Sequence, residues 1–126
     1  LSGEARPMAR AIWAGAIDTV GSNILANVIP KISNNGAVSV CGNAAGFDLS
    51  TTVLPLILRG VSLVGINSVY VPIARRAEGW RRLATELDMD MLDSMTNLVS
   101  FDDLIPLSKE ILKGQVKGRT VVDVNS

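Results

Sequence analysis

The chain has 126 residues, with 12 basic and 12 acidic side chains, a formal net charge of zero and 48% hydrophobic residues. This composition predicts one small globular domain with a packed core, and it excludes an intrinsically disordered chain. Proteins that bind nucleic acid usually carry a basic excess or a basic stripe, and this sequence has neither. We therefore expect no nucleic acid partner.

The sequence contains a single cysteine, Cys41, and no histidine. An intrachain disulfide and a Cys/His zinc site are therefore excluded, and we expect no bound metal. The most apolar stretch, residues 53–66, is short and interrupted by Pro55, Arg59 and Gly60, so we expect no membrane span and no membrane partner. A reducing, cytoplasmic setting fits this cysteine usage. Because the sequence begins Leu-Ser-Gly-Glu without an initiator methionine, we expect it to be a piece of a longer protein.

Apolar runs alternate with amphipathic stretches along the chain, which predicts strands and helices in turn. Ser22 is a good N-cap for the first helix, Pro30 is expected to kink or shorten it, and Asn34-Asn35-Gly36 predicts a turn after it. In chain order, we expect a strand over 13–19, a helix from Ser22, a strand over 37–41, a loop over 42–51, a short helix over 52–58, a strand over 61–67, a helix over 73–87, a strand over 97–101, a helix to about Lys113 and a strand over 119–124.

The helix over 73–87 is predicted to be amphipathic, with one apolar and one basic face. Trp80 lies on the apolar face, and we interpret it as a core residue rather than a platform for a ligand. The arginines are interpreted as a solvated face, with a patch for the phosphates of a CoA ester as the alternative. The apolar positions are Ile73, Ala77, Trp80, Leu83, Ala84 and Leu87, and the basic ones are Arg75, Arg76, Arg81 and Arg82.

The alternation of strands and helices predicts an α/β fold with a largely parallel sheet and right-handed crossovers. The last strand or two are assigned either to this sheet or to a neighbouring one. Polar residues and glycines follow the strands, as in Asp18-Thr19 and Cys41-Gly42. Parallel sheets bind ligands at the carboxyl ends of their strands, so two such edges suggest half of a nucleotide-binding domain.

Five short motifs together resemble a known family over residues 13–125. In that combination the chain resembles the zinc-independent medium-chain dehydrogenase/reductases, and within them the quinone-oxidoreductase-like, acrylyl-CoA reductase branch. The motifs are Ala14–Gly21, Gly36-Ala-Val-Ser-Val-Cys-Gly42, Leu56-Ile-Leu-Arg-Gly-Val61, Gly65-Ile-Asn-Ser68 and Gly118-Arg-Thr-Val-Val122.

The resemblance implies the second half of a Rossmann-type doubly wound parallel sheet, followed by a strand that returns to a catalytic domain. We expect residues 1–95 to form the C-terminal half of the nucleotide-binding domain and residues 96–126 to form the returning segment. The glycine-rich phosphate loop and the loop that recognises a 2′-phosphate lie upstream in the family and are absent from this sequence. The resemblance further implies a homodimer that forms through the edges of the Rossmann sheets, near residues 61–66.

The resemblance also implies which residues contact the cofactor, NADP. Thr19 and Val20 match positions at the adenosine ribose and the central part of the cofactor, and Arg119 matches a basic position at the pyrophosphate, where a guanidinium suits phosphate oxygens. Val116 departs from the pattern, because some relatives have asparagine there. Cys41, Gly42 and Asn43 match a backbone contact to the nicotinamide carboxamide, and Ile66, Asn67 and Ser68 match positions beside the nicotinamide.

Each of these positions also has an ordinary structural interpretation. Asp18 and Ser22 are expected helix caps, with Val20 a core side chain. We interpret Cys41 as a small buried hydrophobic residue in preference to a reactive thiol. Asn67 and Ser68 are alternatively turn residues. Arg119 is alternatively a solvated arginine at the start of a strand.

The expected function is part of an NADPH-dependent oxidoreductase. By resemblance, the whole enzyme reduces an activated carbon–carbon double bond of an acrylyl-CoA-like thioester, or a quinone-like acceptor. No pair of residues forms a convincing acid–base or nucleophilic site, since Asp102-Asp103 is interpreted as a helix start, so the segment alone is expected to be inactive. The alternative is a non-catalytic half-Rossmann module for interaction or oligomerisation.

Overall fold

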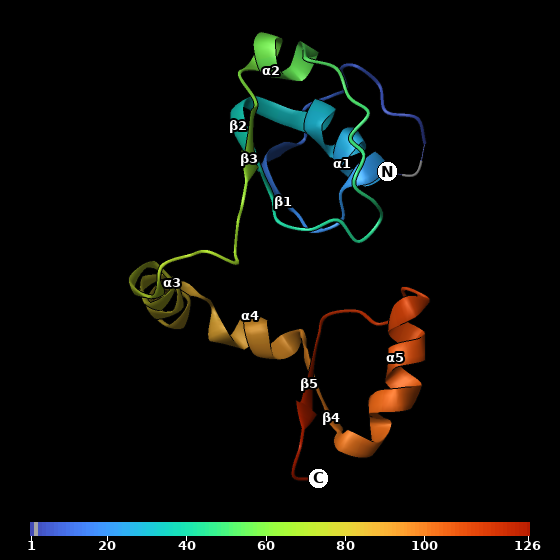
Figure 1. The fold of residues 1–126 in the computed structure, drawn as a ribbon, viewed down its shortest axis with the longest axis vertical. Coiled ribbons are helices and arrows are strands. Elements are labelled where there is room, and N and C mark those ends of the chain that lie inside the picture. Colours follow the sequence, from blue (N-terminus) through green and yellow to red (C-terminus); the bar gives the residue numbers. More distant parts are fainter. Residues whose placement is uncertain (2) are drawn as a thin grey trace. The chain divides into compact units, whose positions relative to one another are not determined.

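The structure, a computed structural model, describes Leu1 and residues 3–126. The chain divides into two compact units, residues 1–71 and residues 72–126 (Figure 1). The boundary between the units lies between Val71 and Pro72. The two helices within residues 73–94 therefore belong to the same unit as the strands that follow them. The expected boundary between the nucleotide-binding half, residues 1–95, and the returning segment, residues 96–126, stays a prediction.

The first unit is a three-stranded sheet in the order β1-β2-β3, and both strand pairs are parallel. Pairs such as Val38–Leu63 and Asp18–Val40 set the register. The predicted α/β class with parallel strands is therefore confirmed. The elements are β1 (Trp13–Asp18), α1 (Ser22–Val28), the 3₁₀ turn η1 (Ile29–Lys31), β2 (Ile32–Val40), α2 (Leu54–Arg59) and β3 (Ser62–Gly65).

The core of this unit lies between α1 and one face of the sheet. Buried side chains from α1, the strands and the turn between them form a single cluster, because the apolar positions of α1 share one helical face. The opposite face is uncovered within the described residues, where Ile17 of β1 is 80% exposed and Val64 of β3 is 43% exposed. The cluster consists of Leu25, Val28, Ile29, Ile32, Val38 and Val61.

The turn expected at residues 34–36 is wrong, because β2 already begins at Ile32. Pro30 ends α1 at Val28, as expected, and the strand follows after one 3₁₀ turn. Strand β2 has more residues than β1 between the pairs Trp13–Ile32 and Gly15–Ala37, so the register of the strand pair shifts there. Asn35 has a positive φ of 59° at this point, so the asparagine signal marks a bulge in place of a turn.

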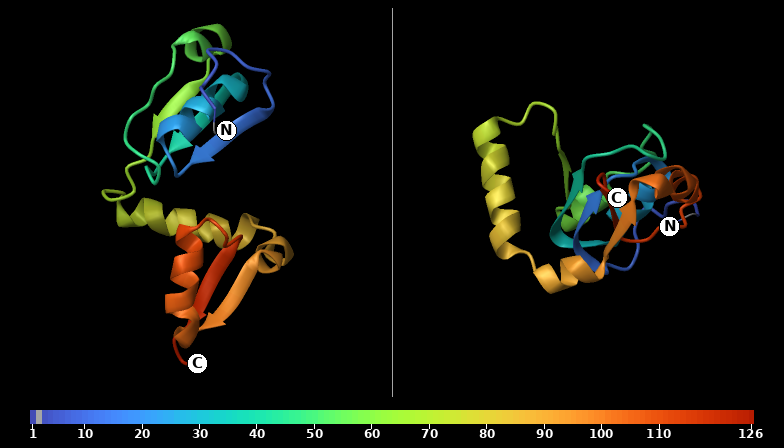
Figure 2. Two further views of the ribbon diagram at one scale, coloured as in Figure 1. Left: turned by 90° about the vertical axis from the view of Figure 1, so that its right-hand side faces the viewer. Right: turned by 90° about the horizontal axis from the view of Figure 1, so that it is seen from below.

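The second unit contains a parallel pair of strands joined by a helix (Figure 2). These strands form their own sheet, which settles the open assignment of the last two strands in favour of a neighbouring sheet. Gly114 follows the last helix with a φ of 70°, as expected of a glycine after a helix. The elements are α3 (Ile73–Glu86), α4 (Met89–Ser94), β4 (Thr96–Ser100), η2 (Phe101–Asp103), α5 (Leu104–Leu112) and β5 (Arg119–Asp123).

The interpretation of Trp80 as a core residue is wrong, because its side chain is 67% exposed. Helix α3 has no buried residue at all. The apolar stripe is present in the sequence, but no element of the described chain covers it. Amphipathic periodicity predicts a helix and an apolar face, and it does not supply the surface against which that face packs.

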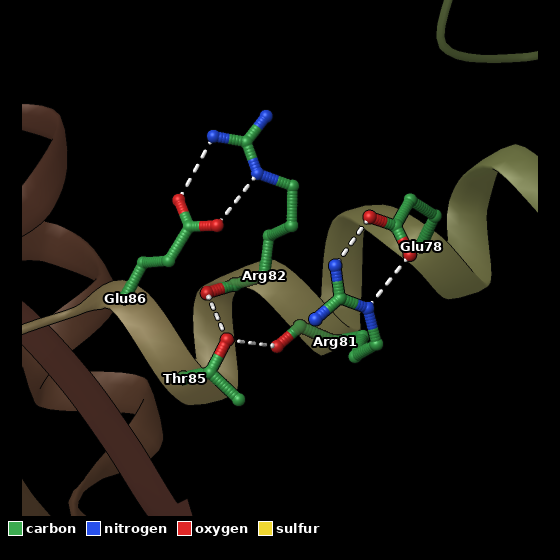
Figure 3. A network of polar contacts seen from close by, with 5 residues as sticks. All are labelled: Glu78, Arg81, Arg82, Thr85 and Glu86. Atoms are coloured by element: carbon green, nitrogen blue, oxygen red, sulfur yellow. Dashed lines mark hydrogen bonds and ion pairs between the residues drawn. The ribbon is translucent and has the colours of Figure 1, made fainter.

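The charged face of α3 carries two ion pairs within the helix (Figure 3). Arg82 contacts Glu86 at 2.8 Å, and Arg81 donates from Nε to Glu78 at 2.7 Å. The arginine hydrogen bonds hold the pKa of Glu78 and of Glu86 below the ordinary value of 4.5, against a smaller opposing effect of desolvation. Both pairs are well exposed to solvent, which supports the solvated-face interpretation for Arg81 and Arg82.

Candidate cofactor site

The carboxyl edge of the β1-β2-β3 sheet brings together eight of the nine predicted cofactor residues. The strands are parallel, so their ends point to the same edge. The hydrogen-bond ladder continues one residue past β2 and β3: the N–H of Cys41 donates to Asp18 O at 2.9 Å, and the N–H of Ile66 donates to Val40 O at 2.9 Å. Backbone pairing therefore fixes where each of these strand ends lies.

The segments that follow β1 and β2 are joined by backbone hydrogen bonds. Ala45 N–H donates to Val20 O at 2.8 Å, and Ala44 N–H donates to Thr19 O at 3.5 Å. A Cβ at Gly42 would overlap the carbonyl group of Thr19. Gly42 is therefore required for the close approach of the two chain segments, a reason that the sequence analysis did not foresee.

Asp18 ends β1 and is buried, with only 5% of its surface exposed. Its Oδ2 accepts a hydrogen bond from the N–H of Gly21 at 2.9 Å. Gly21 is the N-cap of α1 and Ser22 is its first helical residue, with no side-chain cap. The N-cap prediction for Ser22 is therefore wrong by one residue, because Asp18 and a glycine with a φ of 74° make the turn instead.

Cys41 is exposed, so its interpretation as a small buried hydrophobic residue is wrong. The thiol lies at the end of β2 and donates from Sγ to Asp18 O at 3.4 Å. The side chain belongs to the row of β2 that faces away from the core residue Val38, which leaves it uncovered.

The loop after β3 contains a local turn built by Asn67. Its Oδ1 accepts hydrogen bonds from the N–H groups of Val69 at 3.2 Å and Tyr70 at 3.4 Å. This is the turn role that the sequence allowed for Asn67. The neighbouring Ile66 and Ser68 are both exposed.

Two hollows reach the carboxyl edge. One of about 320 Å³ runs from Trp13 along β1 to Val20, beside Ile24 and Val28 of α1. The other hollow, of about 380 Å³, is lined by the ends of β2 and β3 and by the loop that follows β2. Phe47 of this loop is 89% exposed. The lining of this second hollow includes Val40, Gly42, Asn43, Phe47, Leu63 and Gly65.

Arg119, the ninth predicted residue, belongs to the second unit, where it begins β5. Its backbone N–H donates to Met95 O at 2.8 Å, which starts the β4–β5 pairing. Arg119 also lines a hollow of about 520 Å³ with Met95, Val116 and Gly118. Its role at the pyrophosphate stays a prediction.

Two residues organise the first unit in ways that the sequence did not indicate. Asp18 was interpreted as a simple helix cap, although an aspartate at a strand end three residues before a glycine is a recognisable turn signal. Arg59 gave no signal in the sequence. Its guanidinium donates to the carbonyl oxygens of Pro30 at 2.7 Å, Ile32 at 3.2 Å and Ala9 at 2.6 Å.

No group of three or more His, Cys, Asp or Glu side chains suited to hold a metal ion occurs among the described residues. Within the same residues, no helix has the length and apolarity needed to cross a membrane.

Comparisons with known proteins identify relatives over almost the whole chain, although no family model matches it. The acrylyl-CoA reductase AcuI of Ruegeria pomeroyi is 46% identical over 121 residues, which cover 96% of this chain and 37% of that protein. The putative quinone oxidoreductase YhfP of Bacillus subtilis is 39% identical over 121 residues, 95% of this chain and 37% of that protein. The chain thus spans 37% of the length of these curated relatives.

Solved structures agree with these relationships. The yhdH oxidoreductase of Salmonella enterica, crystallised with NADP, matches with a TM-score of 0.83 and 43% identity, over 97% of this chain and 38% of that one. The Bacillus subtilis protein yhfP, crystallised with NAD, matches with a TM-score of 0.79 and 38% identity, over 98% of this chain and 38% of that one. The predicted resemblance to the quinone-oxidoreductase-like, acrylyl-CoA reductase branch of the medium-chain dehydrogenase/reductases is confirmed, and the chain corresponds to the C-terminal part of these proteins.

Proposed function

We propose that the chain is part of an NADPH-dependent oxidoreductase that reduces an activated carbon–carbon double bond, as in acrylyl-CoA, or a quinone-like acceptor. The observation that carries the proposal is the carboxyl edge of the β1-β2-β3 sheet. There, backbone hydrogen bonds fix Cys41 beside Asp18 at the end of β1, and Ile66 beside Val40 at the end of β2. This edge is where parallel α/β sheets bind nucleotides.

In this proposal the chain holds and orients the cofactor. Thr19 and Val20 contact the adenosine ribose and the central part of the cofactor. The backbone at Cys41, Gly42 and Asn43 contacts the carboxamide, and Ile66, Asn67 and Ser68 lie beside the nicotinamide ring. Arg119 supplies a guanidinium to the pyrophosphate. The presence of NADP in the Salmonella enterica structure, which matches 97% of this chain, supports the choice of NADPH.

The cofactor supplies the hydride, and the protein supplies orientation and electrostatics. The chain alone is proposed to be inactive, because it covers 37% of its relative and no acid–base pair was identified in its sequence. The test compares NADPH-dependent reduction of acrylyl-CoA by the full-length protein with that by the purified 126-residue chain. The proposal is supported if the full-length protein reduces acrylyl-CoA and the 126-residue chain does not. Reduction of acrylyl-CoA by the chain alone contradicts it.

The full-length enzyme is further proposed to work in the cytoplasm as a homodimer joined at the edge of this sheet. What supports the dimer is β3, an edge strand in which all four residues, Ser62–Gly65, are exposed. An exposed apolar edge strand promotes association unless it is covered. Val64→Lys, which adds a charge to β3, is expected to convert the dimer into a monomer in light scattering after gel filtration. A monomeric wild type, or an unchanged dimer in the variant, contradicts this arrangement.

A second candidate function is a non-catalytic half-Rossmann module for interaction. The same exposed strand and the uncovered face of the sheet, with Ile17 80% exposed, favour it. The two functions differ in cofactor binding: an interaction module associates through β3 without binding NADPH or NADH.

A further inference from the structure

Asp18 is the one buried charged or polar residue identified among the described residues, with 5% of its surface exposed. Burial of a carboxylate is costly unless hydrogen bonds compensate for the lost water. Oδ2 of Asp18 accepts the N–H of Gly21 at 2.9 Å, and no buried side-chain oxygen or nitrogen in the described part of the chain lacks a partner. The proposed cofactor contacts make no use of this carboxylate.

The turn that Asp18 holds has an unfavourable backbone. Gly21 and Ser22 have consecutive positive φ angles of 74° and 49°. A residue with a side chain rarely adopts a positive φ, and such strain persists only where surrounding contacts enforce it. The hydrogen bond from Gly21 to Asp18 is one such contact. A second is the close packing of Gly21 against Gly46 O, which would lie 2.7 Å from a Cβ.

The backbone of Asp18 joins this turn to the end of β2. Its carbonyl oxygen accepts both the N–H of Cys41 at 2.9 Å and the Sγ of Cys41 at 3.4 Å. Thr19 and Val20 follow Asp18 directly, and Gly42 and Asn43 follow Cys41 directly. The conformation at Asp18 therefore determines where four of the proposed cofactor contacts lie.

We propose that Asp18 is a positioning residue for the cofactor: its carboxylate fixes the strained Thr19–Ser22 turn and through it the ribose and carboxamide contacts. This inference rests on the proposed function. Asp18→Ala removes the acceptor and leaves the Gly21 N–H unpaired, so the Kd and KM for NADPH are expected to rise about tenfold. The kcat is expected to stay within about twofold, since the lost interaction is not specific to the transition state.

The experiment uses the full-length protein that contains this chain and titrates NADPH by calorimetry, with NADPH-dependent reduction of acrylyl-CoA as the kinetic readout. Asp18→Asn is the conservative variant, because its amide oxygen accepts the same Gly21 N–H, and it is expected to recover most of the lost affinity. Asp88→Ala is the matched control. Asp88 caps α4 in the second unit by accepting the N–H of Met91 at 3.0 Å, so this variant loses a turn contact of the same kind and is expected to keep the wild-type Kd.

Each outcome is decisive. A raised Kd in Asp18→Ala, recovery in Asp18→Asn and an unchanged Kd in Asp88→Ala support the positioning role. A wild-type Kd in Asp18→Ala, or no recovery in Asp18→Asn, overturns it. If Asp18→Ala does not fold, Asp18→Val replaces it, because its side chain also lacks an acceptor, and wild-type affinity in folded Asp18→Val overturns the proposal. Absence of NADPH binding by the wild type contradicts the proposed function itself, which separates that failure from a failure of the positioning role.

Discussion

Replacement of Arg59 by alanine is expected to destabilise the first unit more than any substitution of an exposed arginine. The guanidinium donates to three backbone carbonyls, those of Ala9, Pro30 and Ile32, at 2.6 to 3.2 Å. These carbonyls belong to the N-terminal segment, the 3₁₀ turn and the start of β2, while Arg59 itself ends α2. A single side chain thus connects four parts of the unit.

The magnitude follows from the number and kind of these hydrogen bonds. A hydrogen bond to a charged donor contributes about 1.5–3 kcal/mol. The three share one side chain that is partly exposed, so their contributions do not add fully. We expect Arg59→Ala to lower the free energy of unfolding by about 2–4 kcal/mol. Arg59→Lys is expected to recover less than half, because an ammonium cannot reproduce the fork of the guanidinium.

Urea denaturation of the purified chain measures this effect. Trp13 reports on the first unit, since it packs against the core cluster and its ring lies 5.8 Å from Lys31 Nζ. Trp80→Phe removes the second tryptophan from the signal. Arg75→Ala, on helix α3, is the matched control and is expected to change stability by less than about 0.5 kcal/mol. A loss below about 0.5 kcal/mol in Arg59→Ala contradicts a stabilising role for the three hydrogen bonds, because it means that water replaces them without cost.

Three further changes have defined outcomes. Gly42→Ala places a methyl group against the Thr19 carbonyl, and we expect a loss of about 1–3 kcal/mol of stability in the same denaturation assay; wild-type stability contradicts the close approach. Arg81 and Arg82 lower the pKa of Glu78 and Glu86 below 4.5. The two ion pairs therefore stabilise helix α3 above about pH 4.5, and this stabilisation is lost as the pH falls through the lowered pKa values. Circular dichroism of the chain is expected to show this loss of helix, and 1 M salt is expected to weaken the pairs already at neutral pH; a pH-independent helix signal contradicts it. Trp80→Ala is expected to leave the stability of the purified chain unchanged within about 0.5 kcal/mol, because the ring is 67% exposed; a larger loss means that the ring is covered.

The order and type of most elements could be predicted because local patterns determine them, but helix α4 (Met89–Ser94) was not predicted. Pro30 and Gly114 ended or followed helices where expected. Strand β2 was predicted five residues short, since its first residue, Ile32, pairs with Trp13, and pairing between distant residues leaves no local pattern. The asparagine and glycine signal at residues 34–36 was real, but it marks a bulge.

The site was predictable in part for the same reason. The alternation of strands and helices implies a shared carboxyl edge, so the proximity of the segments after β1, β2 and β3 followed from topology. The exposure of Cys41 and Trp80 could not be predicted from topology, because burial depends on which elements cover a face. Arg59 was unpredictable, since its acceptors Ala9 and Pro30 lie 50 and 29 residues away in the chain.

A calorimetric titration measures whether the carboxyl edge of the β1-β2-β3 sheet holds NADPH. The full-length protein that contains this chain is titrated with NADPH and, separately, with NADH. We expect saturable binding of NADPH that is tighter than that of NADH. Absence of binding by either cofactor contradicts it and favours the interaction module.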